Sequence, residues 1–158
     1  MIKVGLGYDI HRLEKDRPLY LGGILIPHHL GLSGHSDGDC LIHAVIDALS
    51  GAAGFPDIGR QFPDTDETFK GIRSTLLLSK VAALFLEEGF RISHIDTILI
   101  SERPRLGPYI PEMQSVLAGI LGVSPSALSI KAKTNEGLGE IGREEAIAAW
   151  SVALIQTS

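Results

Sequence analysis

The sequence predicts an α+β fold, a ferredoxin-like sandwich in which helices pack on one face of a four-stranded mixed sheet. Two observations carry this prediction. Segments that alternate apolar and polar residues are interspersed with segments whose apolar residues recur at helical spacing, and Gly- and Pro-rich turns separate them. At 158 residues and 44% hydrophobic, the chain has the size and apolar content of one domain, which we expect to cover residues 1–158.

Four segments show the alternation expected of strands. The first opens the chain and ends at Asp9, and the second is a hairpin-like segment interrupted by Gly22 and Gly23. The third has isoleucines at its apolar positions, and the fourth follows the predicted helix that ends at Gly122. In order, the predicted strands cover residues 2–9, 18–26, 91–101 and 128–134.

Four further segments show helical spacing of apolar residues. Ser36 followed three residues later by Asp39 indicates the start of the first helix, because such residues cap free backbone N–H groups. Gly89 and Gly122 end the second and third helices. Trp150 is expected on the apolar side of the last helix. The predicted helices cover residues 37–53, 74–88, 109–121 and 144–156.

Helices on one face leave the other face of the sheet without cover. An apolar sheet face has to be buried against something, and further copies of the same chain are the simplest cover. We therefore expect the chain to associate with itself.

Composition excludes several classes of function. A formal charge of −5 at pH 7 argues against a broad nucleic-acid surface, and an anionic substrate would need metal ions and local cations. We find neither a secretory leader nor an apolar run of about twenty residues, so no export and no membrane partner are expected. Cys40 is the only cysteine and cannot form an internal disulfide, which fits a cytoplasmic protein.

The most informative residues are Asp9, His11 and His43. Residues two apart in a strand point to the same side, so Asp9 and His11 can bind one ion together. His43 would complete a set of two imidazoles and one carboxylate, which suits zinc and leaves its fourth tetrahedral position open for catalysis. The alternative is that Asp9 and His11 are ordinary turn and surface residues, as most such pairs are.

Polar residues around His43 extend this candidate site. Asp47 lies one helical turn beyond it, and is either an acceptor for the ring nitrogen that does not bind metal or a solvated carboxylate. His35 and Ser36 lie where the free backbone N–H groups of a helix start converge, which favours a phosphate there. Asp37 is expected to be an acid favoured by the helix dipole rather than a ligand.

Further motifs occur along the chain at fixed separations. They are Gly7-Tyr-Asp-Ile-His-Arg12, Gly34-His-Ser-Asp-Gly-Asp39 with His43, Asp57-Ile-Gly59, Phe62-Pro-Asp-Thr-Asp66, and Lys131-Ala-Lys-Thr-Asn-Glu136 with Gly142-Arg143. Together they resemble the 2-C-methyl-D-erythritol 2,4-cyclodiphosphate synthase family of the non-mevalonate isoprenoid pathway. The resemblance covers essentially the whole chain, and its specificity comes from the joint occurrence of the motifs.

The resemblance implies two metal ions and two catalytic residues. Zinc, or another divalent cation, would bind at Asp9, His11 and His43, which is the site inferred above from spacing. Glu136 would hold a second ion, Mg²⁺ or Mn²⁺, that bridges the substrate diphosphate. The implied catalytic residues are His35 and Thr134.

The resemblance also implies the residues that bind the substrate and its nucleotide part. The substrate-binding positions are Asp9, His11, His35, Ser36, Asp57, Gly59, Phe62, Asp64, Asp66, Lys133, Thr134, Asn135, Glu136 and Arg143. The cytidine part would be held, largely through backbone groups, by Ser101, Arg103, Pro104, Arg105, Leu106 and Gly107. Without the family, the acids near residue 60 would be interpreted as loop and turn formers.

The implied reaction is an intramolecular phosphoryl transfer. In 4-diphosphocytidyl-2-C-methyl-D-erythritol 2-phosphate, the 2-phosphate attacks the β-phosphorus and CMP leaves, which closes 2-C-methyl-D-erythritol 2,4-cyclodiphosphate. The resemblance further implies a homotrimer with active sites between adjacent chains. That assembly would also cover the bare face of the sheet.

Two other functions could use the same three ligands. A mononuclear zinc phosphohydrolase would act through a metal-bound water, and a trimeric zinc-binding module would use the ion for structure alone. The hydrolase requires a general base beside the metal, and a structural site usually has a fourth protein ligand. The sequence offers no obvious residue for either.

The chain departs from the family pattern at Lys133, Asn135 and Glu140. Glu140 stands where several members have an aromatic residue lining a cavity on the trimer axis, and it is close enough in sequence to neutralise Arg143. We therefore expect weak or no binding of prenyl diphosphates there. Lys133 either adds a cation near the substrate phosphates or faces solvent.

Overall fold

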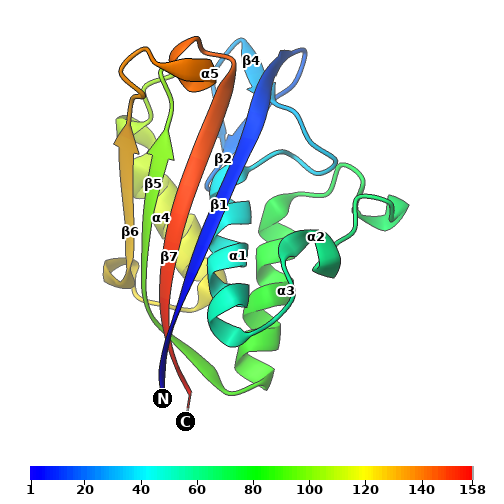
Figure 1. Ribbon diagram of the computed structural model, residues 1–158, viewed down its shortest axis with the longest axis vertical. Helices are drawn as coiled ribbons and strands as arrows, with labels where there is room; N and C mark the ends of the chain where they lie inside the picture. Colours follow the sequence, from blue (N-terminus) through cyan, green and yellow to red (C-terminus); the bar gives the residue numbers. More distant parts are fainter. Residues whose placement is uncertain (158) are drawn as a thin grey trace.

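A curved mixed sheet organises the computed structural model, which describes residues 1–157 (Figure 1). Within these residues the sheet has five strands in the order β4-β1-β7-β5-β6, where β5 and β6 are parallel and the other neighbours antiparallel. Its strands are β1 (Ile2–Lys15), β4 (Leu30–Leu32), β5 (Phe90–Ile100), β6 (Leu128–Lys133) and β7 (Ala146–Thr157). A separate hairpin pairs β2 (Leu19–Leu21) with β3 (Ile24–Ile26).

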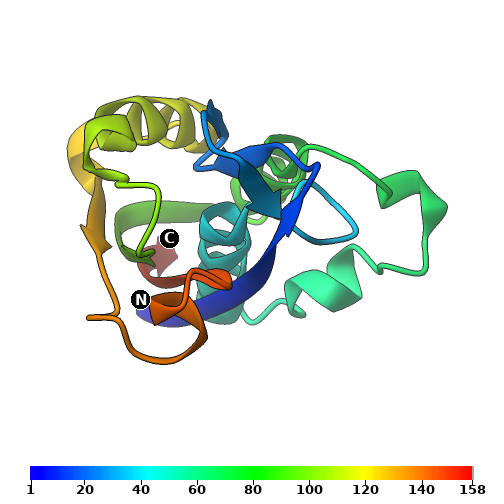
Figure 2. The same cartoon turned by 90° about the horizontal axis from the view of Figure 1, so that it is seen from above.

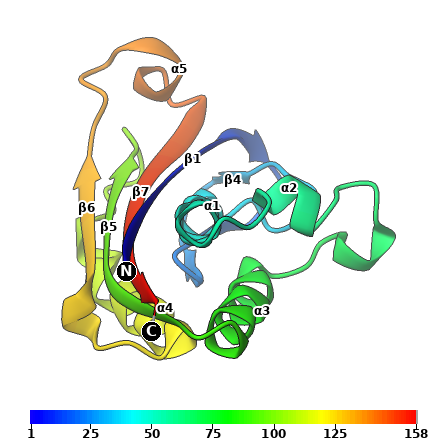
Figure 3. The ribbon, with the colours of Figure 1, turned by 60° about the horizontal axis from the view of Figure 1, so that its bottom comes forward.

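Three helices cover one face of this sheet, as predicted (Figure 3). They are α1 (Cys40–Ala53), α3 (Ser74–Glu87) and α4 (Ile110–Leu121). The shorter helical segments are α2 (Ile58–Gln61), η1 (Glu67–Phe69), η2 (Gly107–Tyr109), η3 (Pro125–Ala127) and α5 (Gly139–Gly142). None of the helices in residues 1–157 combines the length and apolar character that crossing a membrane requires.

The prediction of a last helix over 144–156 is wrong, because this segment forms the strand β7. Its alanines favour a helix in isolation, but β7 lies between β1 and β5 and is hydrogen-bonded along both edges. Ala149 and Ala153 are fully buried in the core beneath α1, where larger side chains would hold the helix away. Trp150 points to the opposite face, is 42% exposed and stacks against Tyr8 with ring centroids 4.5 Å apart.

The prediction of a four-stranded, ferredoxin-like sheet is also wrong. The hairpin at 18–26 does not join the main sheet, while β4 and β7 do, so the main sheet has five strands in the described residues. The order of the main strands also differs. A ferredoxin-like fold alternates as β-α-β-β-α-β, whereas here α4 separates β5 from β6, and only the short α5 separates β6 from β7.

Other predicted boundaries shift less. The first strand continues past Asp9 to Lys15, because its far half pairs with β4. The first helix begins at Cys40, since Asp39 rather than Ser36 is the residue whose side chain caps it, by accepting from the backbone N–H of Ile42. The helices predicted at 74–88 and 109–121 are confirmed to within one residue at each end.

Two glycines allow α1 to lie directly on β1. A Cβ added to Gly5 would stand 1.9 Å from the carbonyl oxygen of Ala48, and one added to Gly7 would stand 1.9 Å from that of Ala44. Helix backbone therefore packs on strand backbone at both positions. This close approach places His43, the residue before Ala44, against the side chains of β1.

The face of the sheet opposite the helices is apolar and exposed. On β1 the outward residues are 41% to 65% exposed, and they are Ile2, Val4, Leu6, Tyr8 and Ile10. Trp150 and Val152 of β7 continue the same surface. A patch of this kind on a folded chain marks an interaction surface.

We predict that Gly7→Ala destabilises the fold by at least about 2 kcal/mol, because the new methyl group meets helix backbone that cannot move aside as a flexible side chain can. The measurement is the free energy of unfolding in urea at one fixed protein concentration. The matched control is Gly51→Ala, at an exposed position of α1 where a Cβ meets nothing within 4 Å. That variant should gain about 0.5–1 kcal/mol. Equal stability of the two variants would contradict the close packing.

Candidate active site

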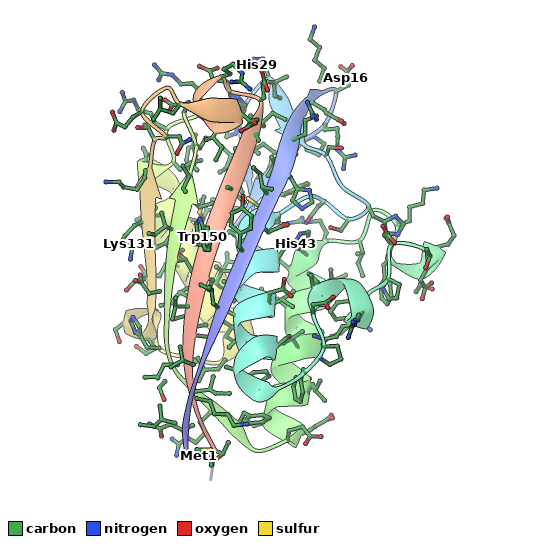
Figure 4. The ribbon with its side chains drawn as sticks, viewed as in Figure 1. Met1, Asp16, His29, His43, Lys131 and Trp150 are labelled. Carbon is green, nitrogen blue, oxygen red and sulfur yellow. The ribbon has the colours of Figure 1, made fainter. Side chains whose placement is uncertain are left out.

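Three side chains from β1 and α1 converge on one point. His11 Nε2 lies 2.8 Å and His43 Nδ1 lies 3.0 Å from Asp9 Oδ2, and the two ring nitrogens are 3.2 Å apart. Asp9 and His11 point to the same side of β1, as their spacing predicts. Figure 4 shows His43 near the start of α1, beside β1. The structure thus brings together the three residues predicted to bind metal.

This arrangement fits a divalent cation. A tetrahedral zinc ion with bonds of about 2.0–2.1 Å holds its ligands about 3.3 Å apart, so the three atoms would separate by only a few tenths of an ångström. The second nitrogen of His11 supports the same role. Its Nδ1 lies 2.5 Å from the carbonyl oxygen of Ser33, which can only accept, so Nδ1 carries a proton and the neutral ring presents its lone pair on Nε2 to an ion.

The electrostatics of the site keep Asp9 ionised. Burial alone would raise the pKa of the Asp9 carboxyl, but when no ion is bound and the facing nitrogens of His11 and His43 carry protons, their hydrogen bonds and charge outweigh burial and lower the pKa from 3.8 to about 2. For His11, burial lowers the pKa, and the contact with Asp9 reverses the effect and leaves the pKa above 6.5. The carboxylate is therefore available as an anionic ligand at neutral pH.

Asp47 does not accept a hydrogen bond from His43. Its carboxylate instead accepts from the backbone N–H of Ile58 at 2.8 Å, where it holds the start of α2. The outer nitrogen of His43, Nε2, lies 2.9 Å from Ser74 Oγ and 3.2 Å from Ser36 Oγ. Ser74 was not predicted from the sequence, because it lies 31 residues away and only the packing of α3 against α1 brings it close.

The metal-binding residues line a cavity of about 440 Å³. The same cavity is lined by five further residues of the predicted substrate site, which are His35, Ser36, Gly59, Phe62 and Asp64. Apolar side chains such as Ile58, Phe69 and Leu77 form much of the remaining wall. A largely apolar cavity with a few convergent polar groups is the usual form of a small-molecule site.

Asp57 and Asp66 lie outside this cavity lining. Asp57 caps α2 by accepting from the N–H of Arg60 at 3.0 Å, and Asp66 caps η1 by accepting from the N–H of Thr68 at 2.9 Å. Both are therefore turn formers in this structure. Their predicted contact with substrate stays a prediction.

A second cavity, of about 340 Å³, lies at the end of β6. Much of the predicted nucleotide segment lines it together with the end of β6 and the residue after it. The lining residues are Ser101, Glu102, Arg105, Leu106, Gly107, Pro108, Ala132, Lys133 and Thr134. Arg103 and Pro104 are outside the lining, and the carbonyl of Arg103 accepts from the Ser101 hydroxyl at 2.9 Å. Lys133 thus lies beside the predicted nucleotide site.

The two cavities are separate within one chain. They share no lining residue in the described part of the structure. The segment of α2 and η1, which walls the first cavity, extends away from β6, beside which the second cavity lies (Figure 2). In the sheet, β7 and β5 separate β1 from β6.

Glu102 joins the nucleotide segment to the loop that carries Glu136. Its Oε1 accepts from the backbone N–H groups of Asn135 and Gly137, both at 2.9 Å, and so holds the loop on either side of Glu136. Glu136 has a positive φ of 55°, and its carboxylate accepts from the hydroxyl of Thr134 at 3.3 Å. Glu102 was not among the site residues predicted from the sequence, although it is the only carboxylate between residues 101 and 107.

Arg143 has a different partner from the expected one. It is exposed and donates to Glu145 Oε1 at 2.9 Å, not to Glu140. The reason is local, because the turn after α5 places both side chains on the same side of the chain, and Glu144 takes a positive φ of 61° between them. Arg143 lines neither of the two cavities described above.

Comparison with known proteins relates the chain to one group of enzymes. The model of the YgbB family matches residues 2–156. A 2-C-methyl-D-erythritol 2,4-cyclodiphosphate synthase of Thermosynechococcus vestitus is 53% identical over 156 residues, which are 99% of this chain and 97% of that protein. A bifunctional enzyme IspD/IspF of Desulforudis audaxviator is 54% identical over 155 residues. This chain spans 39% of the length of that bifunctional relative.

A solved structure agrees with these relatives. The structure of a 2C-methyl-D-erythritol-2,4-cyclodiphosphate synthase in its CDP-bound form matches with a TM-score of 0.89 and 38% identity, covering 98% of this chain and 100% of that chain. The mixed sheet and the placement of its helices are thus shared with an enzyme that binds a cytidine nucleotide.

We predict that His43→Ala reduces bound zinc from about one ion per chain to a small fraction, because two remaining ligands cannot hold a tetrahedral ion. The measurement is metal content by mass spectrometry after dialysis against a weak chelator. His29→Ala, which removes an exposed histidine outside the cavity, is the control and should retain the ion. Equal zinc in both variants would refute the metal site.

Proposed function

The chain belongs to the YgbB family, and we propose that it converts 4-diphosphocytidyl-2-C-methyl-D-erythritol 2-phosphate to 2-C-methyl-D-erythritol 2,4-cyclodiphosphate and CMP. The observation that carries the proposal is the convergence of Asp9, His11 and His43 on the cavity wall, in a chain 53% identical to such a synthase. The proposal includes a single catalytic domain over the whole chain, acting in the cytoplasm. A free, buried Cys40 thiol supports that compartment.

Zinc is the ion we propose at the three ligands, and when bound it supplies a Lewis acid that neutralises phosphate charge. The chain's own contribution is orientation. The Ser33 carbonyl fixes the ring of His11, and the low pKa of Asp9 keeps a full negative charge on the ligand set. His35 and Ser36, which line the same cavity, are placed to donate hydrogen bonds to a phosphate held there.

The reaction needs no nucleophile from the protein. A phosphate monoester has a second pKa of about 6, so the attacking 2-phosphate is already mostly dianionic at neutral pH. Holding the two phosphates in line can lower the barrier by up to about 7–11 kcal/mol. The cavity walls formed by Gly59, Phe62 and Asp64 are suited to hold the methylerythritol part, with the Asp64 carboxylate accepting from sugar hydroxyls.

We assign the departing nucleotide to the second cavity. Arg105 and Lys133 provide cations there and Thr134 provides a hydroxyl, which suit a diphosphate. The wall also contains the carboxylate of Glu102, whose Oε1 already accepts from two backbone N–H groups. Glu136 would hold the second ion, Mg²⁺ or Mn²⁺, since carboxylate oxygens suit hard cations. The hydrogen bonds of Glu102 keep this loop in one conformation.

We propose a homotrimer with shared active sites, and the separation of the two cavities within one chain supports it. A substrate that joins cytidine diphosphate to methylerythritol phosphate has to contact both, and a neighbouring chain can bring its nucleotide cavity to the metal cavity of the first. The exposed apolar face of β1 and β7 supports such an association. Three copies related by rotation close a ring with identical heterologous contacts.

The proposed activity is tested by its products. Purified protein with zinc and Mg²⁺ should convert the cytidine diphosphate-linked substrate to equimolar CMP and cyclic diphosphate, measured by ³¹P NMR. A zinc phosphohydrolase would instead release open-chain phosphates. That product pattern from the full chain would overturn the proposal and favour the hydrolase.

Shared sites predict complementation between defective chains. His43→Ala damages the metal cavity, and Gly107→Trp fills the nucleotide cavity at a position where a Cβ meets nothing within 4 Å. Each homotrimer should be inactive. In trimers mixed at equal ratio, a site is intact when its metal cavity comes from a Gly107→Trp chain and its nucleotide cavity from a His43→Ala chain. This holds for about one quarter of the sites, so about one quarter of wild-type activity should return. No recovery, with mixed trimers demonstrated by native mass spectrometry, would mean that each site is built from one chain.

A further inference from the structure

A buried polar chain leads away from the outer side of His43. The ring, 8% exposed, has its Nε2 at 2.9 Å from the hydroxyl of Ser74, a fully buried residue at the first position of α3. The same hydroxyl lies 2.5 Å from Asp37 Oδ1, and Asp37 is itself buried. His43, Ser74 and Asp37 therefore form a continuous hydrogen-bonded series that begins at the metal cavity and ends in the protein interior.

The surroundings of Asp37 determine the direction of these hydrogen bonds. Its Oδ2 accepts from the Ser74 backbone N–H at 2.9 Å and from Arg73 Nε at 3.2 Å, and its Oδ1 accepts from the Asp39 N–H at 3.2 Å. Each of these three hydrogen-bond partners is a donor, and a carboxylate only accepts. The Ser74 hydroxyl must therefore give its proton to Asp37, which leaves its lone pairs to accept from Nε2–H of His43.

This direction selects one form of the His43 ring. With its proton on Nε2, the imidazole presents a lone pair on Nδ1, the nitrogen that faces Asp9 and His11. His11 reaches the equivalent state by a simpler route, because its outer nitrogen meets a backbone carbonyl that cannot donate. A hydroxyl alone could rotate and donate to His43, and Asp37 removes that freedom.

We propose that Ser74 and Asp37 are positioning residues that hold His43 with its Nδ1 lone pair directed at the metal site. This role rests on the proposed function, because it matters only if Asp9, His11 and His43 bind an ion. Ser36 Oγ lies farther from the same nitrogen, at 3.2 Å, and within residues 1–157 it has no hydrogen bond to a carboxylate that would direct its proton. Ser74 is therefore the acceptor that orients the ring.

The first test measures zinc affinity by competition with a chromophoric chelator at one fixed pH. Ser74→Ala should bind zinc about 10–100-fold more weakly than wild type, the usual loss when an outer hydrogen-bond partner of a ligand is removed. The matched control is Ser50→Ala, which also truncates a buried serine and loses one hydrogen bond, from Gln61 at 2.8 Å, but lies outside the metal cavity. The control should keep wild-type affinity. Equal affinity of Ser74→Ala and wild type would overturn the proposal.

The second test observes the His43 ring in the wild-type protein, so its main result does not require a stable variant. In the zinc-loaded wild type, ¹⁵N-edited NMR should show the His43 Nε2–H proton as a resonance in slow exchange with water, because a buried acceptor protects it. In Ser74→Ala this proton should exchange faster. A wild-type Nε2–H in fast exchange would overturn the role of Ser74. A wild-type chain that binds no zinc at all would instead overturn the proposed function.

Discussion

The contact between the backbones of α1 and β1 is the constraint on which the site depends. Gly5 and Gly7 leave no side chain between the two elements, so the helix rests on the strand at a distance that other residues would not permit. Asp9 and His11 follow on the same strand, and His43 occupies the first turn of the same helix. The packing of α1 on Gly5 and Gly7 thus sets the positions of the three ligands. No flexible loop has to become ordered around an ion to bring them together.

The segment before α1 is fixed by buried polar groups rather than by apolar packing. Asp39 accepts from the N–H groups of Gly22, Gly23 and Ile42, which joins the turn between β2 and β3 to the start of α1. Burial raises the pKa of the Asp39 carboxyl, and the nearby charge of Asp37 adds to this effect. Satisfied buried networks of this type rigidify a site, because each unpaired group would carry a large desolvation cost.

The sequence predicted features that depend on neighbours along the chain, and it missed those that depend on distant partners. Asp9 and His11 could be predicted to lie on one side of β1, because side chains alternate along a strand. His43 could be placed near the start of a helix, because capping residues precede it. The strand β7 was not, since its alanines favour a helix until β1 and β5 supply hydrogen bonds on both edges. Ser74 and Glu102 were also missed, because their partners lie more than 30 residues away and only the folded chain brings them together.

The division of polar groups between two cavities has a thermodynamic consequence. A ligand that bridges two chains binds the assembled form more tightly than the free chain, and linkage requires that the ligand stabilise the assembly by the same free energy. The concentration of substrate and the association of the chains are then thermodynamically coupled. In the proposed trimer, bound substrate would stabilise the association of the chains, and depletion of the substrate would remove that stabilisation.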